Sequence, residues 1–370
     1  MEKFRLLLTL ILIAIFITTN LQFSPQAQQT TINTGSPFIN IIPILPKFPL
    51  NNDFDESPFT PINITVDDDA FHNSNSVQYT EWWYFDAELS NNYTLQFSIH
   101  VYNIISMSFI TVNYNIYQYG QLIEEHRTMY QSSDFNLSED TPNILLHDES
   151  LKMIGVYEPS QQKLYYHITY SIENSSMDLY YRGMTQGWKG KTTAGDWAVM
   201  LPKATVFGTL IVNNTRVNVH GIGYHDHNWN VTISAGLNFG WIWGKANTKT
   251  YTLTWADILT TWFKGDPLLV VNKENNGYYQ IPLEDLTFSI TEIAFKDGML
   301  IPYGFALTGR TDNITVDMDI SVIDSDYTTV LGIINYWRYH VHSKGTITFN
   351  DHTEQIDDYD IAEFIRFRFY

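Results

Sequence analysis

The stretch Tyr93-Thr94-Leu95-Gln96-Phe97-Ser98-Ile99-His100-Val101 alternates apolar and polar residues. This period of two is typical of a β-strand with one buried face, because successive side chains of a strand point to opposite sides of the sheet. The alternation recurs in residues 164–172, 217–219, 314–320 and 346–349, whereas helical spacing is scarce. Turn residues such as Asn213-Asn214 separate the runs at hairpin distances. The pattern predicts an all-β protein of antiparallel sandwiches or barrels, and we favour barrels.

An internal repeat indicates two tandem barrels. At a constant offset of 158 residues, Trp83 corresponds to Trp241, Phe85 to Trp243 and Phe97 to Trp255, and the triplet Tyr-Thr-Leu recurs at 93 and 251. Chance similarity between aromatic-rich strands is the alternative. The repeat predicts a first barrel over residues 66–230 and a second over residues 231–370.

The N-terminal segment predicts export. Lys3 and Arg5 precede an apolar run from Leu6 to Ile17, which matches a secretory signal over residues 1–27 better than a full membrane span. The segment is either cleaved after Ala27 or retained as an anchor that tethers the protein to the membrane. We therefore expect a protein that is secreted or held on the outer face of the cytoplasmic membrane.

A proline-rich segment precedes the predicted barrels, and glycosylation sequons are spread along the chain. Residues 28–65 hold six of the thirteen prolines, which predicts an extended linker, and the following run Asp67-Asp68-Asp69 is expected to be a solvated acidic turn. Glycosylation sequons, which suit an exported protein unless they arise by chance, begin at Asn63, Asn92, Asn136, Asn174, Asn213, Asn230 and Asn313.

Composition excludes several classes of function. The 370 residues include 21 basic and 40 acidic side chains, for a net charge of −19, and no cysteine. The absence of cysteine excludes a disulfide framework, a thiolate nucleophile and an iron–sulfur cluster. The acidic balance without a basic cluster argues against a nucleic-acid partner.

The most unusual stretch runs from Gly221 to Asn230 and reads Gly-Ile-Gly-Tyr-His-Asp-His-Asn-Trp-Asn. On an extended segment, one face carries His225, His227 and Trp229, and the other carries Tyr224, Asp226 and Asn228. A second His-x-His pair is His340 and His342.

A candidate acid lies downstream. Asp257 has the same parity as Trp255, so if these side chains line an interior, a carboxyl group lies among aromatic rings. Burial disfavours the charged form, and such a carboxyl could act as a general acid near neutral pH. His225 or His227 could hold it or position a water, while tryptophan faces stabilise positive charge. The alternative is a structural cluster in which these side chains tie strands together by hydrogen bonds.

The same residues allow a metal site. His-x-His on a strand with a nearby carboxylate can present two imidazoles to zinc, which makes a metal-dependent hydrolase an alternative. We expect no metal, because Trp229 indicates an apolar neighbourhood and no third ligand occurs at a recognisable spacing. Glu81 is expected to be either a buried carboxylate of the first barrel or a strand-end residue satisfied by backbone donors.

The chain resembles the AttH-like and carotenoid 1,2-hydratase family, whose relatives include Diels–Alderases. The resemblance rests on Glu81-Trp82-Trp83-Tyr84 and on Gly221 to Trp229, and it spans roughly residues 66–370. It implies two lipocalin-like barrels in tandem, with an apolar ligand pocket near where they meet. By position, His227 and Trp229 are similar to the histidine and tryptophan of the hydratases, and Asp257 to their acid. The Trp255-Ala256-Asp257 segment differs from the hydratase pattern Tyr-x-Asp.

Together these observations predict an exported protein that encloses a terpenoid or other lipid and catalyses its hydration, isomerisation or cyclisation without an organic cofactor. The expected ligand-contacting residues are Trp83, Tyr224, Trp229, Trp241, Trp243 and Trp255. The alternative from another class is a carrier that binds the molecule without changing it.

Overall fold

The computed structural model describes residues 59–74, 78–104, 107–160, 163–231, 240–259, 265–330 and 334–367. They belong to one compact unit, Asn52–Tyr370. The expected signal and most of the expected linker therefore lie outside the described residues. Among the residues that the structure describes, no helix is long and apolar enough to cross a membrane.

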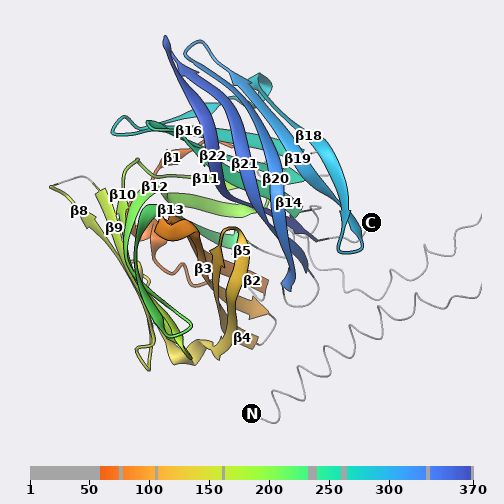
Figure 1. The fold of residues 1–370 in the computed structure, drawn as a ribbon. Helices are drawn as coiled ribbons and strands as arrows, with labels where there is room; N and C mark the ends of the chain where they lie inside the picture. The colour runs from red at the N-terminus through yellow and green to blue at the C-terminus, as the bar shows by residue number, and fades with distance from the viewer. Residues whose placement is uncertain are drawn as a thin grey trace, which may run out of the picture. The chain divides into compact units, whose positions relative to one another are not determined.

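The first sheet is antiparallel and curls into a nearly closed barrel, seen in Figure 1 as the part coloured from orange to green. Its strand order is β5-β4-β3-β2-β13-β12-β10-β9-β8-β7-β6, with β1 and β11 attached beside β12. The strands are β1 (Ile62–Asn63), β2 (Gln78–Leu89), β3 (Tyr93–Ile104), β4 (Met107–Gln118), β5 (Gln121–Gln131), β6 (Phe135–Leu137), β7 (Asn143–Leu146), β8 (Leu151–Glu158), β9 (Lys163–Ile172), β10 (Ser175–Gly183), β11 (Trp188–Thr192), β12 (Gly195–Val212) and β13 (Thr215–Val231).

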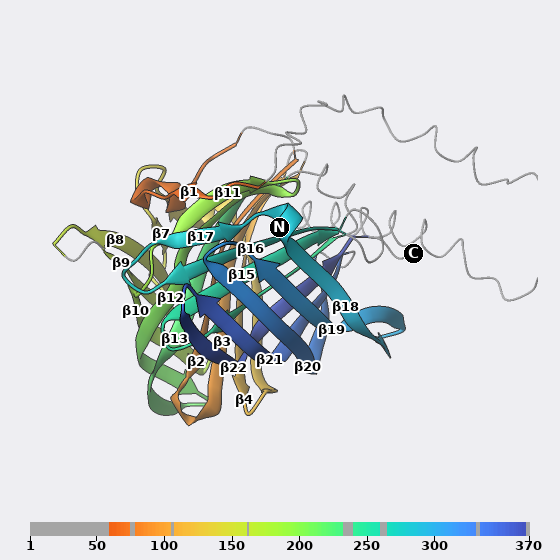
Figure 2. The ribbon, with the colours of Figure 1, turned by 90° about the horizontal axis from the view of Figure 1, so that it is seen from above.

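The second sheet forms a half-barrel, seen in Figure 2 from above as the part coloured from green-blue to dark blue. Its order is β17-β16-β15-β14-β22-β21-β20-β19-β18. The strands are β14 (Gly240–Asn247), β15 (Tyr251–Leu259), β16 (Gly265–Lys273), β17 (Tyr278–Ile281), β18 (Leu286–Lys296), β19 (Met299–Arg310), β20 (Ile314–Val330), β21 (Ile334–Phe349) and β22 (His352–Arg366). Short 3-10 helices occur at η3 (Val66–Asp69), η4 (Ser90–Asn92), η5 (Ser132–Asp134) and η7 (Leu283–Asp285). The predicted all-β fold with two barrel-like domains is confirmed.

The alternation in β3 separates two buried faces. Leu95, Phe97 and Ile99 lie in the core of the first sheet, as the period of two predicts. The polar residues Gln96 and Ser98 on the other face are also only 2% and 1% exposed. They are buried because this face turns toward the second sheet, which the sequence of β3 alone does not reveal.

The repeated hairpins occupy equivalent places in the two sheets. In each sheet the first strand of the hairpin pairs with the strand that comes last in the sequence. Strand β2 of hairpin β2–β3 pairs with β13, and strand β14 of hairpin β14–β15 pairs with β22. The offset of 158 relates Phe97 to Trp255, and both lie in the cores of their sheets.

The expected equivalence of Trp83 with Trp241 is wrong by one residue. Phe97 pairs with Phe85 and Trp255 pairs with Gly244, so the offset between β2 and β14 is 159. Trp82 is therefore the equivalent of Trp241. The shift arises because the second hairpin has the shorter turn, closed by the hydrogen bond from Thr248 N to Tyr251 O.

A third apolar cluster joins the two sheets. Its buried members are Tyr84, Trp188, Trp197, Val199, Tyr224, Trp243, Ala256, Leu268 and Val270. Beside it, the buried Lys245 on β14 binds Asp86 on β2 at 3.0 Å and also contacts Asp360 on β22. The sheets are thus held together by aromatic packing and by a buried ion cluster.

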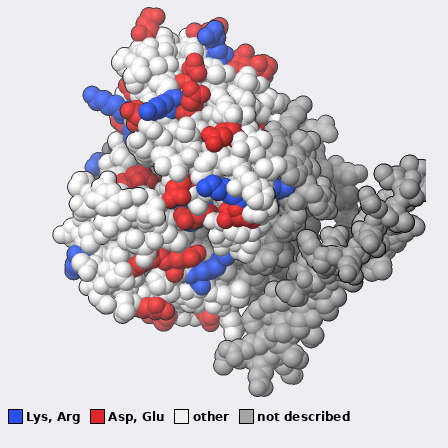
Figure 3. Space-filling model, turned by 45° about the vertical axis from the view of Figure 1, so that its right-hand side comes forward, with Lys and Arg blue, Asp and Glu red and all other residues white. Residues whose placement is uncertain are grey.

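Charges are dispersed over the face of the body shown in Figure 3, where Asp and Glu side chains are scattered among Lys, Arg and a large uncharged surface. The run Asp67-Asp68-Asp69 departs from the expected solvated turn, because Asp69 at the end of η3 is fully buried. Its carboxylate is held by an imidazole of β13.

Candidate functional site

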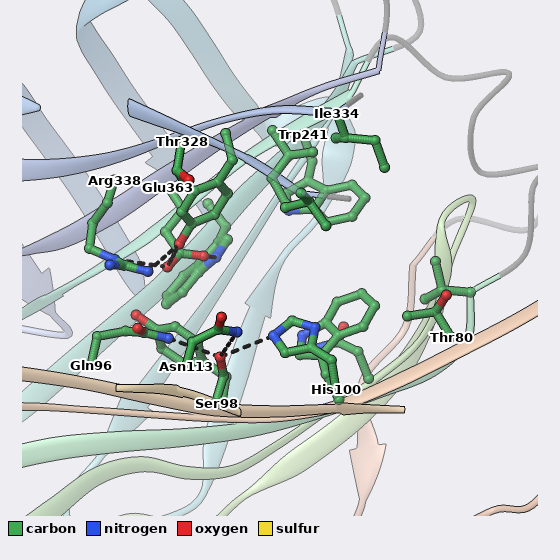
Figure 4. A pocket seen from close by; sticks show the side chains of 18 of the residues that line it. Thr80, Gln96, Ser98, His100, Asn113, Trp241, Thr328, Ile334, Arg338 and Glu363 are labelled. Atoms are coloured by element: carbon green, nitrogen blue, oxygen red, sulfur yellow. Dashed lines mark hydrogen bonds and ion pairs between the residues drawn. The ribbon is translucent and has the colours of Figure 1, made fainter. Parts of the chain in front are cut away.

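A cavity of about 580 Å³ lies between the two sheets. Its walls come mainly from β2, β3, β4, β5 and β13 of the first sheet and from β14, β15, β20, β21 and β22 of the second. Figure 4 shows Arg338 and Glu363 close together, with Gln96 and Asn113 facing them, while Trp241 lies farther along. The volume suits a small organic molecule, and the wall changes from polar to aromatic along its length.

A row of uncharged polar side chains forms one part of the wall. Ser98 Oγ accepts hydrogen bonds from Gln96 Nε2 and Asn113 Nδ2, both at 3.1 Å. Its third contact is with Nε2 of His100, at 3.0 Å. Burial, with a smaller contribution from Arg127, lowers the pKa of His100 to about 3, so this imidazole is neutral and its Nε2 accepts a hydrogen bond from the hydroxyl of Ser98. The row is therefore uncharged.

Opposite this row, Arg338 on β21 is enclosed by oxygen atoms. Its Nη1 donates to Tyr117 Oη and its Nη2 to Tyr336 Oη, both at 2.8 Å. Its Nε lies 3.6 Å from Glu363 Oε1. The Glu363 carboxylate also accepts from Trp243 Nε1 at 3.0 Å and from the hydroxyl of Tyr336. These bonds fix the guanidinium and leave the pair electrically balanced.

The aromatic part of the wall comes from both sheets. Trp82 and Trp241 stack with ring centroids 6.1 Å apart and an interplanar angle of 9°. Tyr84 meets Trp243 edge to face, with centroids 5.4 Å apart. These rings offer apolar faces to a ligand.

Asp226 on β13 is a buried carboxyl group of the cavity wall, and its pKa is raised. Its Oδ2 accepts from Trp197 Nε1 at 3.0 Å and from Tyr224 Oη at 2.8 Å, and its Oδ1 accepts from Asn228 Nδ2 at 3.1 Å. Burial outweighs these hydrogen bonds and raises the pKa of Asp226 to about 7. Near neutral pH a large fraction of this carboxyl group is therefore protonated.

The structure places the expected ligand-contacting residues in different environments. Trp241 and Trp243 line the cavity, and Tyr224 lies behind the wall, where it donates to Asp226. Trp83 and Trp229 lie in the core of the first sheet, and Trp255 lies in the core of the second. Strand alternation explains the division, since cavity-facing Trp82 and Asn228 neighbour the core residues Trp83 and Trp229.

The expected catalytic histidine His227 lies inside the first barrel. Its Nε2 is 2.8 Å from Glu81 Oε1, and its Nδ1 is 3.0 Å from the carbonyl oxygen of Asp68. Both nitrogens face acceptors, and Glu81 and Asp69 raise the pKa of His227 despite the opposing effect of burial. His227 is thus an imidazolium in an ion pair.

His225 lies two residues before His227 on the same face of β13 and makes similar contacts. Its Nε2 is 3.0 Å from Asp69 Oδ2, and its Nδ1 is 2.9 Å from the carbonyl oxygen of Tyr84. We call the buried set Asp69, Glu81, His225 and His227 the histidine clasp, because it ties η3 to β2 and β13. The structure combines parts of the two expectations for Glu81. It is a buried carboxylate of the first barrel that accepts from Tyr79 Oη at 2.7 Å, and it also accepts from the backbone N–H of His72 at 3.0 Å.

A possible metal-ligand set overlaps the clasp. Donor atoms of His72, Glu81 and His227 lie within 4.8 Å of one another, whereas His225 is not part of this set. The contacts among them are direct hydrogen bonds, with His72 Nδ1 at 3.2 Å from Glu81 Oε1. The second pair diverges, since His340 faces Asp326 on β20 and His342 faces Asp357 on β22. The first pair converges on the carboxylate of Asp69, which lies 3.0 Å from His225 Nε2 and 3.4 Å from His227 Nδ1.

The expected acid Asp257 is buried on β15, away from the described cavity wall. Its neighbours Ala256 and Ile258 line the cavity. Asp257 is 4% exposed, and burial, with a smaller effect of Asp266, raises its pKa to about 7. The expected elevation of its pKa is thus present, but neither His225 nor His227 contacts it among the described hydrogen bonds.

Comparison with known proteins gives relatives by structure alone. No protein-family model and no curated protein sequence matches the chain. An AttH-like protein from Nitrosomonas europaea is similar in structure, with a TM-score of 0.59 and 13% identity over 79% of this chain and 93% of that one. The chain shares the fold of AttH-like proteins. CghA in complex with Sch210972 gives a TM-score of 0.57 at 9% identity, covering 79% of this chain and 89% of CghA. Kievitone hydratase from Nectria haematococca gives a TM-score of 0.50 at 14% identity, covering 80% of this chain and 90% of the hydratase.

Several side chains of this cavity are absent from the site that the sequence predicts. Asp226 was placed on the strand face opposite the two histidines, and its face proves to meet the cavity. Glu363 and Tyr336 carry no motif, and no signal in the sequence indicated them. A partial signal was present for the polar row, because Gln96 and Ser98 alternate with core residues.

Proposed function

We propose that this protein binds an apolar small molecule in the cavity between its two sheets and transfers a proton to it from Asp226. The carrying observation is a buried carboxyl group with a pKa of about 7 in the wall of a 580 Å³ aromatic cavity. A general acid with a pKa near the working pH is both protonated and able to give up its proton.

The proton balance defines the reaction class. Asp226 gives its proton to a carbon–carbon double bond or carbonyl oxygen of the ligand and becomes a carboxylate. Tryptophan and tyrosine faces stabilise the positive charge that forms on the ligand. Asp226 then takes a proton back, either from added water in a hydration or from a neighbouring carbon in an isomerisation. Trp197, Tyr224 and Asn228 hold the carboxylate in the meantime.

The proposal moves the acid from Asp257 to Asp226. Both carboxyl groups have a pKa of about 7, but Asp226 lies in the described cavity wall. A ligand in the cavity can reach the first group without moving a strand. The names of two similar structures, a hydratase and a complex with a small molecule, are compatible with this use of the fold.

The experiment begins with the ligand. Purified protein is extracted, the extract is analysed by mass spectrometry, and the recovered compound is incubated with fresh protein in deuterium oxide. Deuterium incorporation or a new product supports proton transfer. Recovery of an unchanged compound only, with no exchange, favours the carrier alternative, and an empty protein that binds no extract component contradicts the proposal.

We also propose that the protein is exported. The sequon asparagines at 63, 92, 136, 174, 213, 230 and 313 are all exposed, so oligosaccharides could attach without unfolding the strands. Sequencing of the N-terminus of secreted protein tests whether residues 1–27 are removed. A mass shift on treatment with a glycosidase tests the modification, and retention of the protein in the cytoplasm contradicts export.

A further inference from the structure

The metal-ligand set of His72, Glu81 and His227 is separate from the cavity. Glu81 on β2 and His227 on β13 point to the core side of the first sheet, and His72 lies on the segment between η3 and β2. None of the three residues lines the cavity. The set therefore takes no part in the proton transfer proposed above, and its chemistry is an independent question.

The distances within the set are close to those of a zinc site. Glu81 Oε1 is 2.8 Å from His227 Nε2 and 3.2 Å from His72 Nδ1, and donor atoms of all three residues lie within 4.8 Å of one another. Zinc binds nitrogen and oxygen at about 2.0–2.2 Å, which places neighbouring ligand atoms of a tetrahedral site about 3.3 Å apart. Shifts of about half an ångström would therefore arrange the three atoms around one ion.

Both imidazoles of the set are held in place by tryptophans. His227 stacks on Trp83, with ring centroids 4.5 Å apart and an interplanar angle of 17°. His72 stacks on Trp229, with centroids 4.1 Å apart and an angle of 4°. The stacking keeps one nitrogen of each ring directed at Glu81. Ligands that are already oriented lose less conformational entropy when they bind an ion.

The set also has the outer hydrogen bonds that metal ligands require. His227 Nδ1 is 3.0 Å from the carbonyl oxygen of Asp68, an arrangement that leaves Nε2 as the nitrogen available to a metal. Tyr79 Oη donates to Glu81 Oε2 at 2.7 Å, so Oε1 remains for the metal. Partners of this kind orient the ligands and make them better donors.

Charge and access are compatible with a divalent cation. Glu81 and Asp69 are both inaccessible to solvent, and Asp69 Oδ1 lies 3.4 Å from His227 Nδ1, so two carboxylates are close enough to offset the charge of the ion. The side chain of His72 is 27% exposed, which gives an ion a path from solvent. Two imidazoles and one carboxylate suit zinc, whereas calcium and magnesium prefer oxygen ligands.

We propose that His72 Nδ1, Glu81 Oε1 and His227 Nε2 bind one zinc ion and leave its fourth position to water. Imidazoles bind zinc through a lone pair, so the proton that His227 Nε2 donates to Glu81 is released to solvent when zinc binds. The alternative is a set that serves only as a hydrogen-bonded tie between β2, β13 and the segment before β2.

Zinc alone is the probe. The protein, prepared without a histidine tag, is treated with a chelator, dialysed and titrated with zinc sulfate in a calorimeter, and elemental analysis after dialysis gives the stoichiometry. We expect one zinc ion per chain and no heat of binding from magnesium. Cobalt(II) in place of zinc should give the intense visible absorption of a four-coordinate site. Failure to retain stoichiometric zinc, or only the weak absorption of six-coordinate cobalt, would overturn the proposal and leave the proposed function of the cavity untouched.

His72→Ala locates the ion, because His72 is the ligand outside the histidine clasp and its loss leaves the clasp in place. We expect this variant to bind zinc at least about tenfold more weakly and to lose the cobalt absorption. His352→Ala is the control, since His352 is 67% exposed and pairs with Glu354 away from the set. The control should bind zinc like the unmodified protein. Unchanged binding by His72→Ala, or an equal loss in both variants, contradicts the site.

Discussion

Asp226 and Glu363 occupy equivalent positions in the two sheets. Asp226 is paired with Tyr84 on β2, and Glu363 is paired with Trp243, the equivalent residue on β14. Each carboxyl group accepts one bond from an indole and one from a phenol. Arg338 accompanies Glu363, whereas no cation contacts Asp226 among the described ion pairs. The duplicated fold has thus produced one balanced carboxylate and one carboxyl group that burial keeps partly protonated.

This difference predicts the effects of two matched substitutions. Asp226→Asn should lower the rate of deuterium transfer at least a hundredfold and leave ligand affinity within a few fold, because general acids contribute about 10²–10⁴ in rate. Asp257→Asn removes the other acid of raised pKa and should retain the rate, since Asp257 does not line the described cavity. Steady-state kinetics of both variants checks this, and the reverse pattern would return the acid role to Asp257.

The pH dependence of the rate follows from the same group. The acid must be protonated, and the pKa of Asp226 is about 7. We expect kcat/KM to be constant below pH 6 and to fall about tenfold for each pH unit above 8. Asp226→Glu, if it retains activity, should shift the profile without abolishing it. A rate that stays level from pH 6 to pH 9 is incompatible with Asp226 as the proton donor.

The sequence predicted the sheets better than the site. The alternation of β3 gave its core face, and the repeat gave equivalent hairpins. The predicted equivalence of Trp83 with Trp241 was wrong by one residue because the turn of the second hairpin is one residue shorter. The sequence does not reveal this difference, since Trp82 and Trp83 are adjacent and either could be matched with Trp241. The opposite orientation of His227 and Asp226 was also predictable from strand geometry. Which of these two faces meets a cavity depends on how the second sheet packs on the first, and a local period carries no information about that packing.

The ion cluster between the sheets should be essential to stability. Lys245 neutralises Asp86 and Asp360, all nearly inaccessible to water. Lys245→Met leaves two buried carboxyl groups without a cation, and such losses cost about 3–5 kcal/mol. Burial raises the pKa of Asp86 to about 7 even with Lys245 present. A carboxyl group with a raised pKa loses its favourable contribution as pH rises through that value, so the variant should be closer to the unmodified protein at pH 5 than at pH 8.

Urea unfolding at the two pH values measures this effect. Lys344→Met, at an exposed position on β21, is the control and should change the free energy of unfolding by less than about 0.5 kcal/mol. A Lys245→Met variant as stable as this control at pH 8 would show that the buried cluster does not hold the sheets together.

The histidine clasp predicts a stability effect with the opposite pH sign. Hydrogen bonds and charge from His227 and His72 overcome burial and lower the pKa of Glu81 from 4.5 to about 2. A lowered pKa of a carboxyl group contributes stability that is present above pH 4.5 and is lost as pH falls toward 2. The shift corresponds to about 3 kcal/mol at neutral pH. Glu81→Gln should therefore destabilise the protein by about this amount at pH 7, and the difference from the unmodified protein should shrink between pH 4.5 and pH 2.

Glu292→Gln, on the exposed part of β18, is the control. Urea unfolding across this pH range checks the prediction, and a loss that is independent of pH would mean that Glu81 acts by packing and not by its charge.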